Sequence, residues 1–364
     1  MSDAGLFSPD FFVARRRFQF AAKRLGWRVE SYPLNLTGPK GADLTVEVAV
    51  SPATGTDQAM VVTSGVHGVE GFLGSAIQLG ICNRWYHEDV RTKRVRCVFI
   101  HGLNPHGFAW LRRFDQNNVD LNRNFLLPDE RYAGCHPGYE SLNSLLNPPT
   151  ARPWIDPFPI HAVRKIYQHG LQALKQCVAE GQYEFPRGLF FGGSEPSFAM
   201  SLLNQQLPSW LAGCERVIHL DFHTGLGRRH QWKLLLDQSL ATGQQKDLQQ
   251  WFGHDRMETA GDNQTAYDVK GCIGRWCARH SHVPNYIYGC AEFGTYSPLA
   301  VLAGLRAENQ AHHWNSPNQR VFWRTKLRLK ELFCPAHPSW RTWAVEQGMT
   351  AVENAFRGLQ QDTA

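Results

Sequence analysis

A histidine and a glutamate three positions apart are the side chains of this sequence that are best placed to do chemistry. His67 and Glu70 lie in the segment VVTSGVHGVEGF, at 61–72. The β-branched and small residues before them predict the end of a buried strand, and 71–84 is predicted to be a helix. Open α/β sheets bind ligands beyond the carboxyl ends of their strands. An imidazole and a carboxylate at that position would supply two of the three protein ligands of a catalytic His₂Glu zinc site.

The third ligand is expected from the end of another strand, because two ligands on one loop cannot complete a tetrahedral site. The segment LDFHTG, at 220–225, has the required form, since a predicted strand ends in His223 and a glycine follows. The segment AEFG, at 291–294, presents Glu292 at the end of a further strand. Hydrolysis at such a site needs a base that takes a proton from water and returns it to the leaving nitrogen, and Glu292 is suited to that role.

The predicted elements alternate between strands and helices. A strand at 59–63, the helix at 71–84 and a strand at 94–100 form a β-loop-α-β unit, which favours parallel pairing. We therefore expect an α/β fold, with three αβα layers around a mixed, mostly parallel and twisted sheet. The remaining elements are a helix at 10–26, a hairpin at 32–51, strands at 215–220, 232–236 and 285–291, and helices at 300–311, at 320–333 and from Trp340 onward.

A stretch rich in proline and glycine, at about 125–208, contains one predicted helix, at 161–181, and few strand signals. We expect it to be an insertion that wraps the sheet. Since no linker or repeat is visible, 1–364 is expected to form a single domain, with the chemical motifs at 59–295 and C-terminal helices at about 300–364.

Composition excludes several classes of protein. The 364 residues are 43% hydrophobic and carry a net charge of +6, spread too evenly for a nucleic-acid surface. The nine cysteines form no CxxC pair, which is typical of reduced cysteines in the cytosol. The N-terminal residues do not resemble a signal peptide, and no run of 18 apolar residues predicts a membrane span. We expect a cytoplasmic protein that binds neither nucleic acid nor membranes; its oligomeric state stays open.

Beyond these residues, the sequence resembles the zinc carboxypeptidases of the carboxypeptidase A superfamily, over about 59–295. The segment NPHGF at 104–108 is similar to the family's Asn-Pro-Asp-Gly-Phe/Tyr turn, and DLNRN at 120–124 matches its Asp-x-Asn-Arg-Asn run. Tyr267, followed by Gly271 and Trp276, resembles the segment of a mobile tyrosine. The resemblance is greatest to a bacterial carboxypeptidase-like branch of unsettled function, related to succinylglutamate desuccinylase and aspartoacylase.

The resemblance implies a role for each matching residue. His67, Glu70 and His223 would hold one Zn²⁺, and Asp120 would accept the second ring N–H of His67. The roles implied for the substrate-facing residues are a carboxylate clamp of Asn122 and Arg123, with support from Asn104, an oxyanion contact from Arg113 or alternatively Arg112, and closure over the substrate by Tyr267.

Three departures from the family's pattern bear on specificity. His106 replaces the usual Asp of the turn, and Thr224-Gly225 follows the third ligand where the peptidases have Ser-Tyr. At the position where carboxypeptidases contact the substrate side chain, this chain has Gly274, with Arg275 beside it. A small residue with a neighbouring cation is expected to admit an acidic or bulky group.

The sequence thus predicts a zinc-dependent amide hydrolase of carboxypeptidase type. Its substrate would be a small peptide or an N-acyl amino acid with a free carboxylate. Two alternatives stay open: a deacylase of small N-acyl amino acids, like aspartoacylase and the desuccinylases, and a zinc-binding scaffold that does not catalyse.

Overall fold

The computed structural model describes residues 3–53, 56–149, 180–259 and 270–361. One eight-stranded sheet forms its centre, with the strand order β1-β2-β4-β3-β5-β8-β6-β7. The central strands pair in parallel and comprise β4 (Arg96–His101), β3 (Gln58–Ser64), β5 (Arg216–Thr224) and β8 (Asn285–Phe293).

Strands at both sides make the sheet mixed. β1 (Arg28–Thr37) and β2 (Asp43–Val50) form the predicted hairpin, and β2 pairs antiparallel with β4. On the other side, β6 (Trp232–Leu236) pairs antiparallel with β8, and the short β7 (Met257–Thr259) pairs in parallel with β6. The prediction of a mixed, mostly parallel sheet is confirmed.

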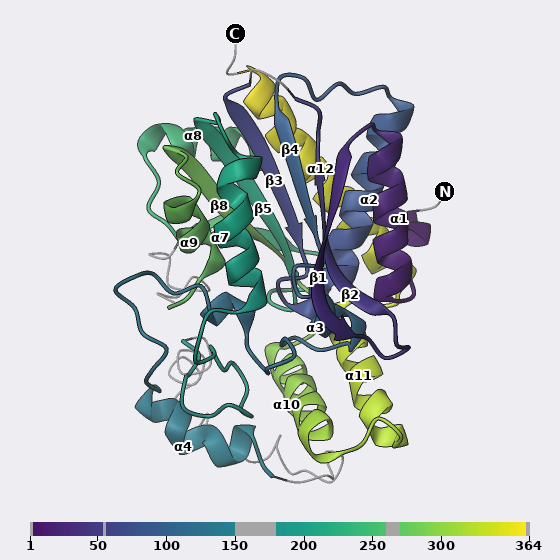
Figure 1. Cartoon of the computed structure of the whole chain (residues 1–364), viewed down its shortest axis with the longest axis vertical. Helices are drawn as coiled ribbons and strands as arrows, with labels where there is room; N and C mark the ends of the chain where they lie inside the picture. Colours follow the sequence, from purple (N-terminus) through teal and green to yellow (C-terminus); the bar gives the residue numbers. More distant parts are fainter. Residues whose placement is uncertain (1–2, 54–55, 150–179, 260–269, 362–364) are drawn as a thin grey trace.

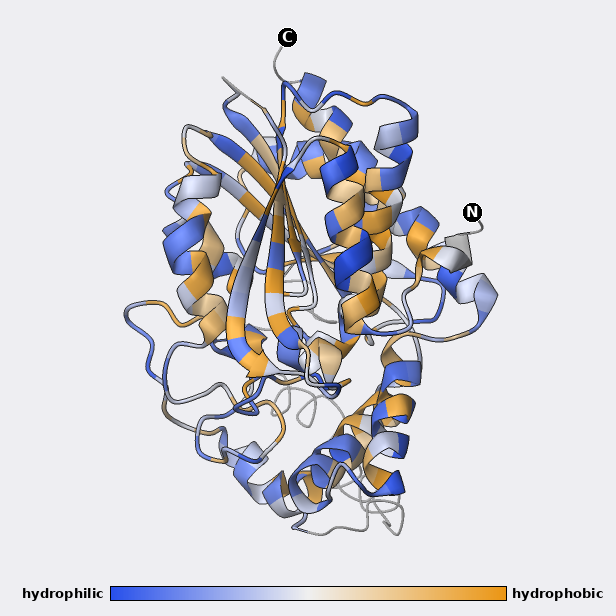
Figure 2. Ribbon diagram, turned by 45° about the vertical axis from the view of Figure 1, so that its right-hand side comes forward, coloured by the Kyte–Doolittle hydropathy of each residue, from blue (hydrophilic) through white to orange (hydrophobic). Residues whose placement is uncertain are grey.

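Helices cover both faces of this sheet (Figure 1). α1 (Phe11–Arg24), α2 (Gly71–His87) and α12 (Pro338–Gln361) pack on one face, and α7 (Phe198–Trp210) and α9 (Ile273–His280) pack on the other. The outer helices carry both hydrophobic and hydrophilic residues (Figure 2), as expected for helices with one buried face, whereas α2 is buried on all sides from Gly71 to Cys82. The predicted three-layer αβα architecture is confirmed.

Successive side chains of β5 point to opposite faces of the sheet. Ile218 and Phe222 enter the core on the α2 face, whereas Asp221 and His223 point to the opposite face. β8 lies beside β5 in register, so that Glu292 is directly opposite His223. The carboxyl ends of these two parallel strands therefore bring a histidine and a glutamate together.

A helical layer lies beyond the carboxyl ends of the central strands (Figure 1). It contains α4 (Pro137–Leu146), α10 (Pro298–Trp314) and α11 (Arg320–Phe333). Their apolar side chains form a separate core cluster that includes Val69, from the loop that carries His67 and Glu70. The C-terminal helices thus support the loop after β3.

The described part of the stretch predicted to be an insertion, at 125–149 and 180–208, contains two helices that the sequence analysis did not predict. One is α4, and the other is α7, whose Leu203 and Leu207 are buried against the sheet. α7, at the end of this stretch, therefore belongs to the helical layer on one face of the sheet. The predicted helix at 161–181 lies outside the described residues apart from its last two, which are not helical.

The other predicted strands and helices are confirmed to within a few residues, while β7, α9 and α8 (Thr242–Phe252) were not predicted. All eight cysteines in the described residues are free thiols. Among the described helices, none has the length and apolar composition needed to cross a bilayer.

Candidate metal centre

The loop after β3 is held tightly against the chain that follows β4. Gly68 N donates to the carbonyl of Arg113 (3.1 Å), and Val69 N donates to that of Arg112 (2.7 Å). A Cβ on Gly68 would lie 2.1 Å from the carbonyl carbon of Gly107, so only glycine permits this close approach. Backbone contacts thus fix His67 and Glu70, which flank these two amides.

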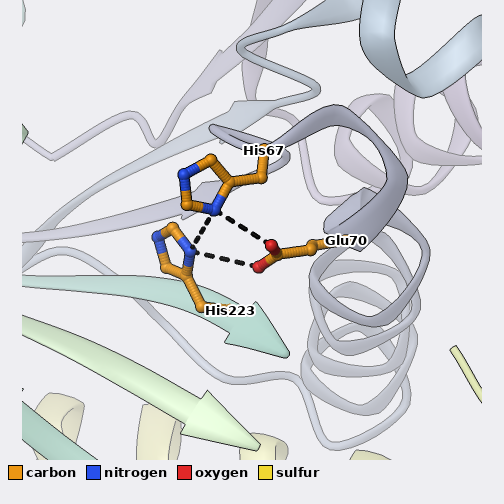
Figure 3. A group of neighbouring side chains, drawn as sticks. All are labelled: His67, Glu70 and His223. Atoms are coloured by element: carbon orange, nitrogen blue, oxygen red, sulfur yellow. Dashed lines mark hydrogen bonds and ion pairs between the residues drawn. The ribbon is translucent and has the colours of Figure 1, made fainter. Parts of the chain in front are cut away.

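His67, Glu70 and His223 converge on one point (Figure 3). The Nδ1 atoms of the two histidines are 3.1 Å apart. Glu70 Oε1 lies 3.0 Å from His67 Nδ1, and Glu70 Oε2 lies 3.2 Å from His223 Nδ1. All three side chains are buried.

Two further carboxylates determine which ring nitrogen faces this point. His67 Nε2 lies 3.1 Å from Asp120 Oδ1, and His223 Nε2 lies 2.6 Å from Asp221 Oδ2. Because a carboxylate accepts, each Nε2 carries the hydrogen and each Nδ1 presents a lone pair. Either a proton on one of these Nδ1 atoms or a metal cation between them relieves the repulsion of the two nitrogens and the carboxylate.

This donor set fits a zinc ion. Ligand atoms about 2.0 Å from a tetrahedral Zn²⁺ lie roughly 3.3 Å from one another, close to the separations found here. The carboxylates of Asp221 and Glu70 outweigh the opposing effect of burial and raise the pKa of His223 well above its usual value. Burial likewise opposes ionisation of Glu70, but the two histidines hold its pKa well below the usual range. These charges favour a cation at the centre.

Glu292 lies beside the centre, at the end of β8. One of its carboxylate oxygens is within 4.8 Å of a ring nitrogen of His223 and of Cys290 Sγ. Oε1 accepts a hydrogen bond from the backbone N–H of Leu226 (2.8 Å). Burial and the negative charge of Glu70 raise the pKa of Glu292 to about 7, against His223 and Arg113, which lower it. A carboxyl group with this pKa can accept and return a proton at neutral pH.

Of the two arginines considered for the oxyanion, only Arg113 contacts the centre. Its Nε lies 2.8 Å from Asp120 Oδ2, and its Nη1 lies 3.2 Å from Glu70 Oε1. Although burial opposes it, the charges of Arg113 and His67 hold the pKa of Asp120 well below its usual value. Arg113 thus contacts both the candidate metal ligand Glu70 and Asp120, the partner of His67.

The contacts of Arg112 show that its side chain cannot serve the oxyanion, which was the alternative assignment. Its side chain is fully buried and bonds Glu308 Oε1 (3.0 Å) and Asn118 Oδ1 (2.8 Å). Lys326 Nζ lies 2.5 Å from the same Glu308 oxygen. The side chain of Arg112 therefore belongs to a buried ion cluster with residues of α10 and α11. Its backbone carbonyl accepts from Val69 N, in the loop that carries His67 and Glu70.

Asn104 packs against the loop that carries Arg112 and Arg113, and it is not in a position to bind substrate. It is 2% exposed and caps the short helix α3 (Pro105–Ala109) by accepting from Gly107 N (2.8 Å). Its Nδ2 donates to the carbonyl of Arg113 (3.2 Å). Both ends of the amide are thus used to hold the loop, and the predicted support of a carboxylate pocket is indirect.

Asn122 and Arg123 lie on the short helix η3 (Leu121–Arg123). Asn122 Oδ1 accepts from the N–H of Ile273 (3.1 Å), which joins this helix to the start of α9. Arg123 Nη1 donates to the carbonyl of Asn122 (2.7 Å), and its buried Nε has no partner. Within the described ranges no carboxylate pairs with Arg123, so this guanidinium keeps donors for a ligand. Tyr267 lies outside the described residues.

The sequence analysis missed the role of Asp221 and of the residue behind it. Tyr288 Oη donates to Asp221 Oδ2 (2.9 Å), the oxygen that also holds His223. The signal for Asp221 was present, since a residue two positions before His223 on a strand shares its face. Tyr288 comes from β8, and only the pairing of the two strands brings it to this position.

Comparison with known families assigns the chain to one family. Residues 7–347 match the model of a family described as a protein of unknown function, DUF2817. The chain belongs to this family. No curated protein matches the sequence.

Solved structures with a similar fold are metallocarboxypeptidases. Thrombin activatable fibrinolysis inhibitor has a TM-score of 0.54 at 11% identity, over 97% of this chain and 74% of that one. The bovine form, in complex with tick carboxypeptidase inhibitor, has a TM-score of 0.52 at 11% identity, over 98% of each chain. Carboxypeptidase A from Helicoverpa armigera has a TM-score of 0.53 at 11% identity, over 97% and 73%. The chain has a carboxypeptidase-like fold; at these identities the similarity extends to the fold alone.

Proposed function

We propose that this protein is a zinc-dependent amide hydrolase of carboxypeptidase type. The observation that supports this most directly is the convergence of His67 Nδ1, His223 Nδ1 and Glu70 at 3.0–3.2 Å, with Glu292 beside them. Both ring tautomers are set for metal binding by carboxylates. The fold is that of known metallocarboxypeptidases.

The proposed roles divide between the ion and the side chains around it. Zn²⁺ would polarise the scissile carbonyl and lower the pKa of water. Glu292 takes a proton from the attacking water and returns it to the leaving nitrogen. The N–H of Leu226 anchors Oε1 of that carboxylate, which leaves the second oxygen for proton transfer.

Two guanidinium groups act on the substrate in this proposal. Arg113 stabilises the negative charge that develops on the carbonyl oxygen, a contribution of about 3–4 kcal/mol to the barrier. Arg123, whose buried Nε has no partner, binds a substrate carboxylate with the planar geometry of a guanidinium. The substrate would then be a peptide cleaved at its C-terminal bond or an N-acyl amino acid.

The deacylase alternative shares the metal ligands, the base and the carboxylate clamp, and differs only in the size of the acyl group. The scaffold alternative predicts no turnover. Two tests distinguish the proposals. Metal analysis of the purified protein should find about one zinc per chain. A panel of blocked dipeptides and N-acyl amino acids, assayed before and after removal of zinc with a chelator, should show turnover only in the zinc-loaded protein.

Glu292→Gln is the matched control for this test, because it keeps the shape of the side chain. We expect the variant to retain zinc and to lose hydrolysis by a factor of about 10²–10⁴. Absence of zinc from the parent protein, or equal turnover by parent and variant, would contradict the proposed function. Turnover of N-acyl amino acids without turnover of dipeptides would select the deacylase.

A further inference from the structure

A cavity of about 360 Å³ lies in the helical layer beyond the ends of the central strands. It is formed by the end of α4, the C-terminal half of α10 and the segment at 184–188. None of its described lining residues belongs to the candidate metal centre or to the carboxylate clamp. Its volume is within the range of roughly 300–1,000 Å³ that is typical of sites for small molecules. The cavity is therefore large enough for a ligand of its own.

Gln310 lines this cavity with an amide group that the protein leaves unsatisfied. The side chain is 2% exposed, and neither its Oε1 nor its Nε2 has a hydrogen-bond partner among the described residues. A buried amide without partners costs stability, and its presence in a native structure requires a water or a ligand that completes it. Gln310 thus offers an acceptor beside a donor to whatever occupies the cavity.

Two other amides of the lining are already bonded within the protein at both ends. Asn309 Oδ1 accepts from Arg112 Nη2 (3.0 Å), and Asn309 Nδ2 donates to the carbonyl of Arg187 (2.8 Å). Asn147 likewise accepts from a backbone N–H through Oδ1 (2.9 Å) and donates to a tyrosine hydroxyl through Nδ2 (3.0 Å). A sugar needs polar partners around its whole ring, and these amides have none to offer. The buried part of the cavity suits a ligand with a single polar edge, which Gln310 can satisfy.

Aromatic and charged side chains complete the lining. Phe185 and Trp314 supply flat apolar surface, and Trp314 is 41% exposed, at the rim. The guanidinium of Arg187 lies 5.2 Å from the centre of the Trp314 ring, and none of the described carboxylates pairs with it. Glu184, the carboxylate of the lining, accepts from Gly134 N through Oε1 (3.0 Å). The cavity thus combines aromatic walls and a buried donor–acceptor pair with a cation at its rim.

We propose that this cavity binds adenine, as part of a nucleoside or a nucleotide, and that Gln310 recognises the edge of the base. That edge has an N–H donor beside a ring-nitrogen acceptor, and a glutamine amide pairs with both at once. The two faces of the base are flat and apolar, and they pack against aromatic side chains. The guanidinium of Arg187 suits a phosphate group at the rim. The site is separate from the metal centre and does not depend on the proposed hydrolysis.

Calorimetry of the zinc-loaded protein with adenosine tests the proposal. We expect one adenosine per chain, and purine riboside, which lacks the exocyclic amine, should bind about 3- to 10-fold more weakly. Adenosine monophosphate should bind more tightly than adenosine if the ligand is a nucleotide, and equally well if it is a nucleoside. The absence of saturable binding at about 1 mM adenosine would overturn the proposal. Tighter binding of guanosine or of glucose than of adenosine would also overturn it.

Gln310→Met separates recognition of a ligand from a structural role. It keeps the length of the side chain and removes both polar atoms, so it should weaken adenosine binding by about 10- to 100-fold. The free energy of unfolding should not fall, because an unsatisfied amide has been removed. Unchanged binding, or a marked loss of stability, would contradict the role of Gln310. Trp314→Ala, at the exposed rim, leaves the buried amide in place and should weaken binding by about 10-fold.

Two control variants locate the site. Gln249→Met, which changes an exposed glutamine of α8, should bind adenosine as the parent protein does. Arg123→Ala should also bind it normally, because Arg123 is not in the lining of the cavity. Loss of binding in Arg123→Ala would assign adenosine to the proposed substrate site and overturn the inference. Since these experiments measure binding alone, a failure to find hydrolysis would leave their outcome unchanged.

Discussion

Asp221 and His223 form the shortest contact between a candidate metal ligand and a carboxylate outside the ligand set, 2.6 Å from Oδ2 to Nε2. The two residues are on the same face of β5, and Tyr288 Oη donates to the same Asp221 oxygen. His67 has an equivalent contact with Asp120, at 3.1 Å. Each histidine of the centre is therefore oriented by an acidic residue. Of the two acidic residues, only Asp120 belongs to a motif that the sequence shares with the zinc carboxypeptidases.

We expect Asp221→Asn to weaken zinc binding by about 10- to 100-fold, because partners of this kind fix ring orientation and raise ligand basicity. The dissociation constant for zinc, measured by competition with a chelator, checks this. Tyr288→Phe is the graded control, since it removes one hydrogen bond from Asp221 and keeps the carboxylate. A zinc affinity of Asp221→Asn equal to that of the parent would show that the contact does not orient the ligand.

The pKa of Glu292 predicts the pH dependence of hydrolysis. Burial and Glu70 raise this pKa to about 7, and the base must be ionised to accept a proton. The value of kcat/KM should therefore fall as the pH decreases through the pKa of Glu292. Because a bound divalent cation lowers that pKa, the acid limb should lie at or below about pH 7. A rate profile from pH 4 to 9 measures it, and the residual rate of Glu292→Gln should lack this limb. A rate that rises toward acid pH would contradict the assignment.

Arg123→Ala should raise KM for substrates with a free carboxylate and lower their kcat/KM by about 10- to 100-fold, the size of a lost charge-assisted hydrogen bond. Substrates with a C-terminal amide should be unaffected, because they have no carboxylate to bind. Arg123→Lys keeps the charge without the planar fork, and should recover part of the loss. The clamp would be refuted if the parent protein used the amide and the acid equally well.

Glu308→Gln should destabilise the protein by about 3–5 kcal/mol, because it removes the buried carboxylate that pairs with both Arg112 and Lys326. Urea unfolding measures this loss. Asp89→Asn removes an ion pair with Arg91 in which both side chains are at least 70% exposed, and it should change the stability little. Similar stabilities of the two variants would show that the buried cluster contributes no more to stability than an exposed ion pair does.

The sequence by itself predicted a mixed, mostly parallel sheet and the three candidate metal ligands. Apolar runs predicted the core strands, and their alternation with helices predicted parallel pairing. Parallel strands end at one edge, so residues that follow them, such as His67 and His223, could be expected to meet although 156 positions separate them. This inference is local in character, because it needs only the type of each element and the position of a residue at its end.

Tertiary structure alone decided which neighbours each side chain meets. Arg112 and Arg113 are adjacent in sequence, yet one pairs with Glu308 of a distant helix and the other with Glu70. Gly274 was recognised as a small residue, but its closest neighbours, the ring of Tyr288 on β8 and the carboxylate of Asp237 after β6, depend on how β6, β8 and α9 pack. Such contacts depend on how separate elements pack and on the conformation of each side chain, and no periodic pattern in the sequence specifies either.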